Sequence, residues 1–335
     1  MVGQHFIKFL QGHPWFEITF LGASDRSAGK PYREATSWRL DGAMPAGVEG
    51  MTVQECKPEK APGLVFSAMD ASVATEIEQA FAQAGRTVVS NSRNHRMEPD
   101  VPLLIPEINA EHLGILARQR SNRGWKGQIV TNPNCSTIVL AMALAPLKQF
   151  GIRRVLATTM QAISGAGYPG VASMDIVANV VPFIGSEEEK MQQETQKILG
   201  DFSADSLRPL DAKVSAHCNR VPVVDGHMVA TSVELERKPG EAEIIAALES
   251  FRGRPQEREL PSAPAKPVQY MREKDRPQPR RDALRDKGMA VYVGRLRECP
   301  VLDYKFMALG HNTIRGAAGA AVLNAELMHS DGLLG

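Results

Sequence analysis

The stretch QIVTNPNCSTIVLAMALAPLKQF, residues 128–150, indicates the fold class of this chain. A short apolar, β-prone run passes through an Asn-Pro-Asn turn into an apolar helix expected over 138–150. The same alternation occurs upstream, where helical spacing predicts helices over 2–11 and 72–83. Strands that are apolar throughout and alternate with helices are typical of a doubly wound parallel sheet. The predicted strands of this sheet are 16–21, 63–68, 87–90 and 128–131.

After Cys135 the pattern becomes that of a second, α+β domain. A strand is expected over 154–162 and a polar-faced helix over 187–199. Asp225-Gly226 is a hairpin turn signal, and it predicts two antiparallel strands around it, at 221–224 and 229–235.

The C-terminal third contains a long polar segment and a final helix. Residues 252–288 are rich in Pro and Arg and poor in apolar residues, which predicts a long surface excursion, a solvated loop rather than a basic binding arm. The Ala-rich stretch 316–328 predicts a helix that packs back onto the first domain.

Composition excludes several classes of function. A length of 335 residues suits two domains. Lys plus Arg number 39 and Asp plus Glu 38, so the net charge of +1 predicts no nucleic-acid and no membrane partner. No apolar stretch is long enough to span a bilayer, and the first residues do not resemble a signal peptide. The four cysteines lack paired spacing, which predicts a reduced, cytoplasmic protein, and no spacing typical of a metal site occurs.

Cys135 is the first candidate for chemistry. It follows a strand and a turn and precedes a helix, whose dipole lowers the pKa of a thiol at its N-terminus. Free backbone N–H groups there can also hold a developing oxyanion. A lone cysteine is just as often a small core residue, so position alone leaves both interpretations open. The flanking Asn-Pro-Asn and Ser-Thr, which form turns and caps, favour a shaped nucleophile turn.

His227 and Arg220 lie on the predicted hairpin. A base and a cation from this hairpin would serve Cys135 if the fold brings them together, but an ordinary surface hairpin explains the same residues.

Ser24, Arg26 and Ser27 follow the first predicted strand. In a dinucleotide-binding fold, residues at such a strand end meet the adenosine ribose, and an arginine with two serines suits the 2′-phosphate of NADP. A plain polar turn explains them equally well.

Taken together, ordered motifs over nearly the whole chain resemble those of the aspartate-semialdehyde dehydrogenases, especially the branch typical of archaea and fungi. The motifs are 132–137, 161–167, 185–190, 218–223 with Gly226-His227, 275–280 and 311–316. The resemblance implies an α/β fold with two domains. A Rossmann-like NADP-binding domain would comprise 1–134 and 316–335, and an α+β catalytic and dimerisation domain 135–315.

The resemblance also implies a role for individual residues. The catalytic residues would be Cys135 as the acyl-thioester nucleophile, His227 as the general acid/base and Gln161, which orients the acyl group. The substrate would be held by Arg220 on its α-carboxylate, by Glu187 on its amine, and by Arg96, Asn134 and Lys190 on its leaving phosphate. The cofactor NADP(H) would contact Gly3, Ser24, Arg26, Ser27, Ser67, Ser164, Gly165 and Asn312.

The implied reaction is the reductive dephosphorylation of L-aspartyl 4-phosphate to L-aspartate 4-semialdehyde by NADPH. It feeds lysine, diaminopimelate, threonine, methionine and isoleucine biosynthesis. The thiolate expels phosphate, and the resulting thioester accepts hydride more readily than a carboxylate would. The implied partners are this small-molecule substrate, inorganic phosphate and further copies of the chain in a homodimer or homotetramer.

Two alternatives stay open. A related thioester-forming reductase would act on malonyl-CoA or N-acetylglutamyl phosphate, although Arg220 with Glu187 favours an amino acid substrate. The other alternative is an inactive binding protein. In the family, a Gly-rich turn stands just before the segment that matches residues 1–4. Of the glycines of that turn, only the last one could be present in this sequence, as Gly3. We favour a translation start upstream of Met1 over a genuine truncation, which would weaken pyrophosphate binding.

Overall fold

Three short parallel strands, in the order β3-β4-β5, form the sheet of the N-terminal half. Their bounds are β3 (Leu64–Ser67), β4 (Thr87–Ser90) and β5 (Gln128–Thr131), and β4 pairs with both neighbours. The computed structural model describes residues 1–203 and 206–334. Within this part of the chain, no helix has the length and apolar character needed to cross a bilayer.

Helices cover both faces of this small sheet. Val88 and Ile129 share an apolar cluster with Phe81 of α4 (Ala71–Gln83). On the other face, Val89 and Val130 cluster with α1 (Val2–Leu10) and α13 (Gly319–Ser330). Burial on both faces explains why these strands are apolar throughout, and it confirms the predicted doubly wound parallel arrangement.

A six-stranded mixed sheet forms the other half, in the order β11-β12-β13-β10-β6-β9. Pairs β6–β9 and β11–β12 are parallel, and the other neighbours are antiparallel. The strands are β6 (Ile152–Gln161), β9 (Lys213–Arg220), β10 (His227–Leu235), β11 (Val268–Met271), β12 (Val291–Glu298) and β13 (Tyr304–Gly310).

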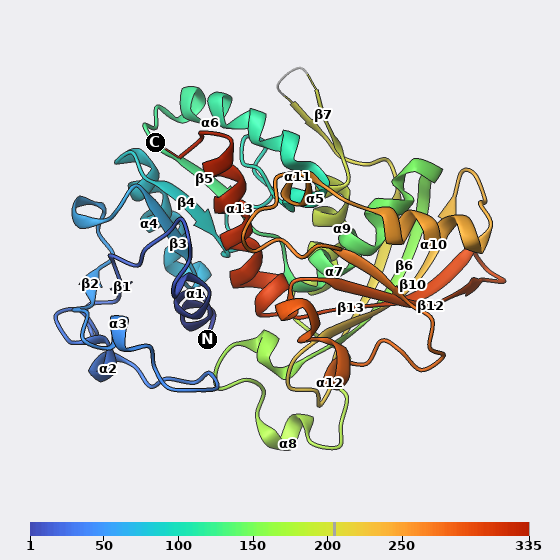
Figure 1. Cartoon of the computed structure of the whole chain (residues 1–335), viewed down its shortest axis with the longest axis horizontal. Helices are drawn as coiled ribbons and strands as arrows, with labels where there is room; N and C mark the ends of the chain where they lie inside the picture. Colours follow the sequence, from blue (N-terminus) through green and yellow to red (C-terminus); the bar gives the residue numbers. More distant parts are fainter. Residues whose placement is uncertain (204–205, 335) are drawn as a thin grey trace.

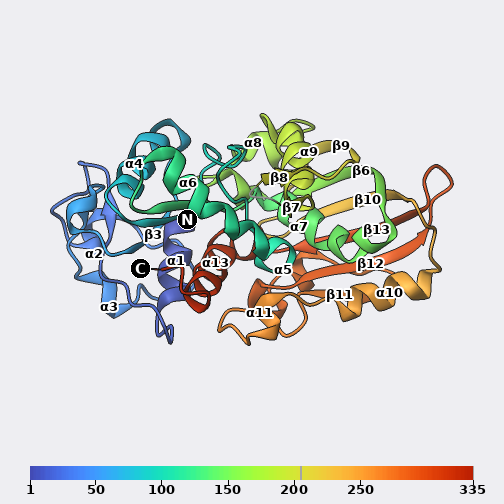
Figure 2. The same cartoon turned by 90° about the horizontal axis from the view of Figure 1, so that it is seen from above.

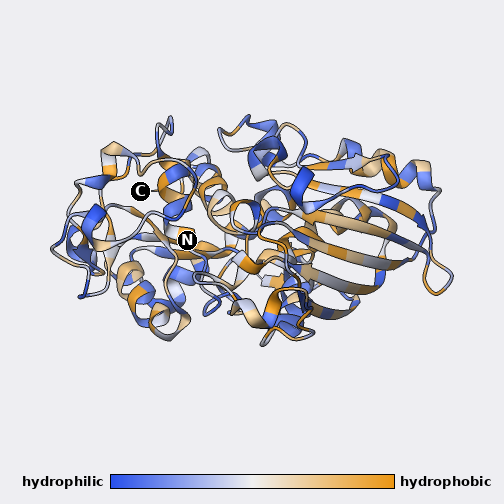
Figure 3. Ribbon diagram, turned by 90° about the horizontal axis from the view of Figure 1, so that it is seen from below, coloured by the Kyte–Doolittle hydropathy of each residue, from blue (hydrophilic) through white to orange (hydrophobic). Residues whose placement is uncertain are grey.

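One face of this large sheet is covered by helices. α7 (Cys135–Leu144) packs on β10, β12 and β13, while α9 (Glu187–Ile198) packs on β9 and α10 (Glu241–Ser250) on β11. Figure 3 shows strands of the opposite face with no helix in front of them. Every α7 residue from Ser136 to Leu144 is buried, as expected for a helix that is apolar all round.

The chain returns to the small sheet at its C-terminal end. A π-helix, η6 (Ile314–Ala318), leads into α13, which contacts α1 and β4. Figures 1 and 2 place the two sheets side by side along the molecule, with α13 at their junction. This confirms the predicted Ala-rich helix and its packing onto the first sheet.

Short elements complete the chain. They are β1 (Gly22–Ala23), α2 (Tyr32–Ala35), α3 (Ala46–Glu49), β2 (Gln54–Glu55), η1 (Pro58–Lys60), α5 (Pro106–Asn109), η2 (Ala110–Ile115), α6 (Leu116–Arg123), η3 (Ala145–Phe150), η4 (Ile163–Ala166), α8 (Ser173–Ile176), β7 (Asp201–Ser203), β8 (Ser206–Arg208), α11 (Arg254–Glu257), α12 (Pro279–Asp282) and η5 (Arg285–Gly288).

The strand predicted over 16–21 is wrong. The structure has no strand over 16–21. β1, a two-residue strand that pairs in parallel with β2, begins directly after this run. Phe16, Ile18 and Phe20 instead line a cavity of about 560 Å³. A β-prone run becomes a strand only where a neighbour satisfies its backbone groups, and here β2 reaches only the end of the run, where the Gln54 N–H donates to the Leu21 carbonyl.

The predicted hairpin around Asp225-Gly226 is also wrong. Residues 221–224 lie outside the sheet, where the carbonyl groups of Val223 and Val224 accept hydrogen bonds from Ile163 and Ser164. β10 pairs with β6 and β13 instead. The sequence analysis also missed β9, although its Val, Ala and Cys alternate with Lys, Ser and His as in a half-buried strand, and it missed β12 and β13.

The surface excursion predicted over 252–288 is only partly correct. Val268–Met271 form β11 at the edge of the large sheet, and Val268 is completely buried. Prolines and arginines on either side obscure this short apolar run. The helix predicted over 138–150 begins three residues earlier, at Cys135, and its last residues form η3.

The ion pair between Arg315 and Glu107 lies at the junction of the two sheets. Both side chains are fully buried, and the guanidinium donates to the two carboxylate oxygens at 2.8 and 2.7 Å. Removing one partner leaves an uncompensated charge in the interior.

We expect Glu107→Gln to lower the free energy of unfolding by about 3–5 kcal/mol, measured by urea denaturation. Glu243→Gln is the matched control, because it removes an equally bidentate but exposed pair with Arg237 and is expected to change stability little. Equal losses in the two variants would contradict the importance of the buried pair.

Candidate active site

Cys135 is the first residue of α7, and Asn134 caps this helix. The Asn134 Oδ1 atom accepts hydrogen bonds from the backbone N–H groups of Ser136 at 2.9 Å and Thr137 at 3.2 Å. A Cβ atom at Gly316 would lie 2.7 Å from the Cβ of Cys135. Only glycine therefore allows η6 to approach the thiol so closely.

Strand ends carry the predicted catalytic residues Gln161 and His227 and the predicted substrate-binding residue Arg220. Gln161 and Arg220 end the parallel strands β6 and β9 and are register partners. His227 begins β10, which runs antiparallel to β6. Its Nε2 atom lies 3.2 Å from Cys135 Sγ. The side chains of Gln161, Arg220 and His227 are all buried.

The protonation form of His227 follows from its second ring nitrogen. The backbone N–H of Ala162 donates to His227 Nδ1 at 3.0 Å, so Nδ1 acts as an acceptor. A neutral imidazole then carries its proton on Nε2, which faces the sulfur. His227 is therefore oriented as a hydrogen-bond donor toward Cys135 and toward any oxygen that forms beside it.

Burial dominates the ionisation of this pair. Burial, followed by the Glu187 charge, raises the pKa of Cys135 to about 12, although the Arg220 and Arg96 charges act in the opposite direction. Burial, followed by the Arg220 charge, lowers the pKa of His227 to about 3. A thiol and a neutral imidazole are thus the forms near neutral pH.

The helix N-terminus does act to lower the pKa of Cys135, through the backbone N–H of Ser136, but burial outweighs it, so the expected net lowering is wrong. A helix dipole contributes about 0.3–1 kcal/mol near a helix end. Taking a thiolate out of water costs more than this, and sequence position does not reveal how deeply the thiol is buried.

Arg220 supplies a buried cation beside the sulfur. Its Nη1 atom donates to the carbonyl oxygen of Ala162 at 2.8 Å. No ion pair to Arg220 occurs within the described residues, so its remaining donors can bind a carboxylate from outside the chain. A Cβ atom at Gly165 would lie 2.9 Å from Arg220 Nη1 and from His227 Nε2. Gly165 therefore keeps the space beside both side chains free.

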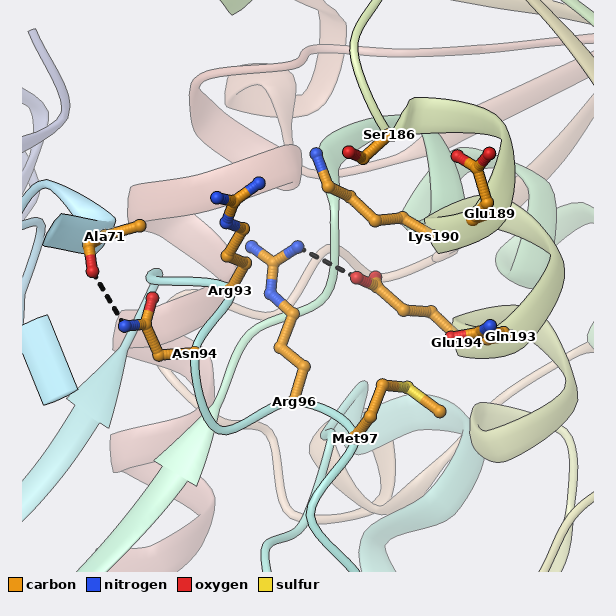
Figure 4. A pocket seen from close by; sticks show the side chains of 10 residues that line it. All are labelled: Ala71, Arg93, Asn94, Arg96, Met97, Ser186, Glu189, Lys190, Gln193 and Glu194. Carbon is orange, nitrogen blue, oxygen red and sulfur yellow. Dashed lines mark hydrogen bonds and ion pairs between the residues drawn. The ribbon is translucent and has the colours of Figure 1, made fainter.

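The predicted phosphate-binding residues meet on the other side of Cys135. Arg96 and Lys190 line a pocket of about 410 Å³. Figure 4 shows their side chains converging from a loop and from α9. Arg93, which the sequence analysis missed, adds a third cation to the lining and lies three residues before Arg96.

Glu187 connects this region to the nucleophile turn. Its Oε1 atom accepts a hydrogen bond from Asn134 Nδ2 at 2.7 Å, and its Oε2 atom accepts one from Lys190 Nζ at 3.2 Å. The structure thus brings Glu187, expected at the amine of the substrate, into contact with Asn134 and Lys190, expected at its phosphate.

Asn312 joins the two segments expected on the nicotinamide side. Its Oδ1 atom accepts from the Gly226 N–H at 2.8 Å, and its Nδ2 atom donates to Ser164 Oγ at 2.7 Å. Ser164 and Gly165 lie in η4, next to the strand end that carries Gln161. Asn312 therefore holds the turn before His227 against the glycine-rich segment.

The remaining predicted cofactor residues divide into two groups. Gly3, Ser27 and Ser67 line the cavity of about 560 Å³ between α1, β3 and residues 16–23. The hydroxyl groups of Ser27 and Ser67, with the backbone N–H groups of the first turn of α1, are donors that fit the sugar and phosphate oxygens of a dinucleotide. Ser24 and Arg26 are exposed in the adjoining turn and do not line the cavity.

Sequence reasoning missed two further buried polar residues. Asn132 donates to Asn91 Oδ1 at 2.9 Å and to the Ala317 carbonyl at 2.7 Å, which joins the end of β5 to η6. Glu194 contacts both Arg96 and Asn134. The sequence contains a sign of each. Asn132 belongs to the nucleophile motif, and Glu194 lies two helical turns after Glu187, on the same face of the predicted helix.

Comparison with known families gives two matches. The NAD binding domain of semialdehyde dehydrogenases matches residues 1–115, and the semialdehyde dehydrogenase dimerisation domain matches residues 144–315.

Similar proteins come from archaea and fungi. The aspartate-semialdehyde dehydrogenase of Methanothermobacter thermautotrophicus is 51% identical, over 98% of this chain and 96% of its own length. That of Schizosaccharomyces pombe is 46% identical, over 99% of this chain and 96% of its own length. The crystal structure of aspartate-semialdehyde dehydrogenase with NADP from Candida albicans has a TM-score of 0.92 at 43% identity, over 99% of this chain and 96% of that one. The chain therefore belongs to the aspartate-semialdehyde dehydrogenase family.

Proposed function

We propose that the protein catalyses the NADPH-dependent reductive dephosphorylation of L-aspartyl 4-phosphate to L-aspartate 4-semialdehyde, through a thioester on Cys135. The contact of Cys135 Sγ with His227 Nε2 at 3.2 Å, between Arg220 and the Arg96–Lys190 pocket, carries this proposal. A substrate with a carboxylate at one end and a phosphate at the other matches this distribution of charge. The product feeds lysine, diaminopimelate, threonine, methionine and isoleucine biosynthesis.

The first half of the reaction forms the thioester. Arg220 binds the α-carboxylate and Glu187 the amine, while Gln161 orients the acyl group. The Cys135 thiol loses its proton, its thiolate attacks the acyl carbon, and the carbon–oxygen bond to phosphate breaks. The proton ends on the leaving group, which departs as hydrogen phosphate. Phosphate leaves toward Arg96, Asn134 and Lys190. The Arg220 and Arg96 charges favour the thiolate, since both lower the pKa of Cys135.

The second half releases the aldehyde. When bound, NADPH supplies a hydride to the thioester carbonyl carbon. The His227 Nε2–H group faces the sulfur and donates to the oxygen that becomes negative there. As this oxyanion re-forms a carbonyl group, the carbon–sulfur bond breaks and the semialdehyde is freed. The Cys135 sulfur leaves as a thiolate and takes up a proton from water, which restores the thiol.

The cofactor would occupy the groove beside the small sheet. We place its nicotinamide near Ser164, Gly165 and Asn312. The adenosine side would contact Gly3, Ser67 and the turn with Ser24, Arg26 and Ser27, where Arg26 would meet the 2′-phosphate. The related enzyme from Candida albicans, whose crystal structure contains NADP, supports NADP as the cofactor. Residues 1–134 and 316–335 would then form the cofactor domain, and 135–315 the catalytic and dimerisation domain.

Related thioester-forming reductases for malonyl-CoA or N-acetylglutamyl phosphate are less well supported. Both of the curated relatives described above bear the name aspartate-semialdehyde dehydrogenase. Arg220 and Glu187 also offer a cation for a carboxylate and an anion for an amine, and an amino acid substrate has both of these groups.

We also propose a reducing, cytoplasmic location. Catalysis needs Cys135 as a free thiol, and Cys56, Cys135, Cys218 and Cys299 are all unpaired.

Replacing the nucleophile tests the proposed function directly. Phosphate-dependent reduction of NADP with aspartate semialdehyde should be measurable for the wild type. Cys135→Ser should lower turnover by about 10⁴-fold or more, because a hydroxyl is a far weaker nucleophile, with the melting temperature unchanged. Cys299→Ser is the matched control and should keep full activity, since Cys299 lies at the far end of β12. Activity retained in Cys135→Ser, or a wild type active only on malonyl-CoA, would refute the proposal.

The pH dependence of alkylation tests the ionisation of the site. Because the pKa of Cys135 is raised to about 12, its thiolate is the minor form and grows about tenfold per pH unit below that value. The rate of iodoacetamide labelling of Cys135, followed by mass spectrometry, should therefore rise from pH 7 to 9 without a plateau. A plateau below pH 8 would show a thiolate already formed.

For the oligomer, we infer a homodimer formed through the open face of the large sheet, with a homotetramer as a further pairing. Outward side chains form rows across β6, β10 and β13 that include Thr158, Ala230 and Met307. Leu156 on this face is 48% exposed. Its row continues through Ser232 to Lys305, so the face mixes apolar and polar side chains, as interfaces between protein subunits do.

Leu156→Arg should shift the protein from dimer toward monomer in analytical ultracentrifugation, because it places a charge in the proposed interface. Val301→Arg changes an even more exposed apolar residue, in the turn between β12 and β13, and it should leave the mass unchanged. A dimer that survives Leu156→Arg at micromolar concentration would place the interface elsewhere.

A further inference from the structure

Glu194 joins two parts of the site that the proposed reaction uses separately. It lies on α9, and only 2% of its side chain is exposed. Its Oε1 atom accepts a hydrogen bond from Arg96 Nη1 at 2.9 Å, and its Oε2 atom accepts one from the Asn134 backbone N–H at 2.6 Å. One carboxylate thus contacts both a phosphate-pocket cation and the residue directly before the nucleophile.

Arg96 is held in one orientation by its contact with Glu194. Its Nη1 atom donates to Glu194 and its Nη2 atom to the carbonyl of Asn91 at 2.8 Å, as Figure 4 shows for the first of these bonds. Its buried Nε atom has no hydrogen-bond partner among the described residues. Two fixed contacts leave the other N–H groups of Arg96 for an anion in the pocket shared with Arg93 and Lys190.

The loop that carries Arg96 is fixed by the same helix. Lys197, one turn after Glu194, is buried, and its ammonium group donates to three backbone carbonyls. These belong to Arg96, Glu98 and Val101, at 2.7, 2.7 and 2.8 Å. The backbone around Arg96 therefore has little freedom, and the direction of its guanidinium depends on Glu194.

We propose that Glu194 is a positioning residue that couples the leaving-phosphate pocket to the nucleophile turn. It aims Arg96 at the phosphate, and it holds the Asn134 backbone, so that the cap of α7 and the sulfur of Cys135 keep their places relative to that cation. The proposal rests on the proposed function, in which phosphate leaves toward Arg96.

Both oxygens of Glu194 are needed for this role. A carboxylate accepts hydrogen bonds at each oxygen, and its charge strengthens the bond to a guanidinium. A glutamine offers one acceptor oxygen, and its NH₂ group would face either the Arg96 guanidinium or the Asn134 N–H, donor against donor. Glu194→Gln therefore keeps the shape of the side chain and removes one of the two contacts.

The test separates phosphate from semialdehyde in the oxidative direction, with NADP and full-length protein. Glu194→Gln should raise the KM for phosphate about tenfold and lower kcat, while the KM for aspartate semialdehyde stays within about twofold of the wild type. Glu76→Gln makes the same change on an exposed residue of α4 and should behave as the wild type. A purely structural defect would change both KM values together.

A double-mutant cycle tests whether Glu194 acts through Arg96. The phosphate KM of Arg96→Gln/Glu194→Gln should equal that of Arg96→Gln alone within about twofold. If Glu194→Gln melts below the assay temperature, Glu194→Asp replaces it. It keeps the charge but is one methylene too short to reach both donors, so the phosphate KM should rise about threefold.

Three results would overturn the proposal: an unchanged phosphate KM in the folded variant, equal changes in both KM values, or fully multiplicative effects in the cycle. A wild type without phosphate-dependent turnover would count against the proposed function instead, which keeps the two failures distinct.

Discussion

The hydrogen bond between Cys135 Sγ and His227 Nε2 is the contact on which the arrangement of the site depends. α7 carries the thiol from the end of β5 in the small sheet, and β10 carries the imidazole in the large sheet. The contact can exist only where the two sheets meet. Gly165 and Gly316 keep this junction free of Cβ atoms, and the Ala162 N–H orients the imidazole from behind. Backbone groups, which have little freedom to move, thus set both the position and the protonation form of His227.

Burial and charge act against each other around this contact. Burial raises the pKa of Cys135 and lowers the pKa of His227, which keeps both side chains neutral. The charges of Arg220 and Arg96 act in the opposite direction on the thiol. The reactivity of Cys135 therefore depends on how closely these cations are held. Arg96 is held by the buried carboxylate of Glu194 on α9, and Arg220 by the backbone carbonyl of Ala162.

Local patterns carried much of the information about this protein. The apolar strand, the Asn-Pro-Asn turn and the helix after it predicted the nucleophile turn, and ordered motifs predicted the family. The parallel sheet and the returning C-terminal helix are confirmed. The strand over 16–21 and the hairpin at 221–235 are wrong, because a strand forms only where a remote segment offers its backbone groups. The lowered pKa of Cys135 is wrong because local sequence shows a helix end but not its burial.

The sequence by itself therefore determined the fold class, the nucleophile turn and the set of charged residues, since these depend on patterns within one or two neighbouring elements. Only the tertiary structure decided how those residues act on one another. Cys135 and His227 are separated by 92 residues, and Asn134 and Glu194 by 60. The tautomer of His227, the raised pKa of Cys135 and the bridge through Glu194 all follow from distances and burial at this junction. Such quantities arise from the packing of two sheets against shared helices, and no local pattern contains them.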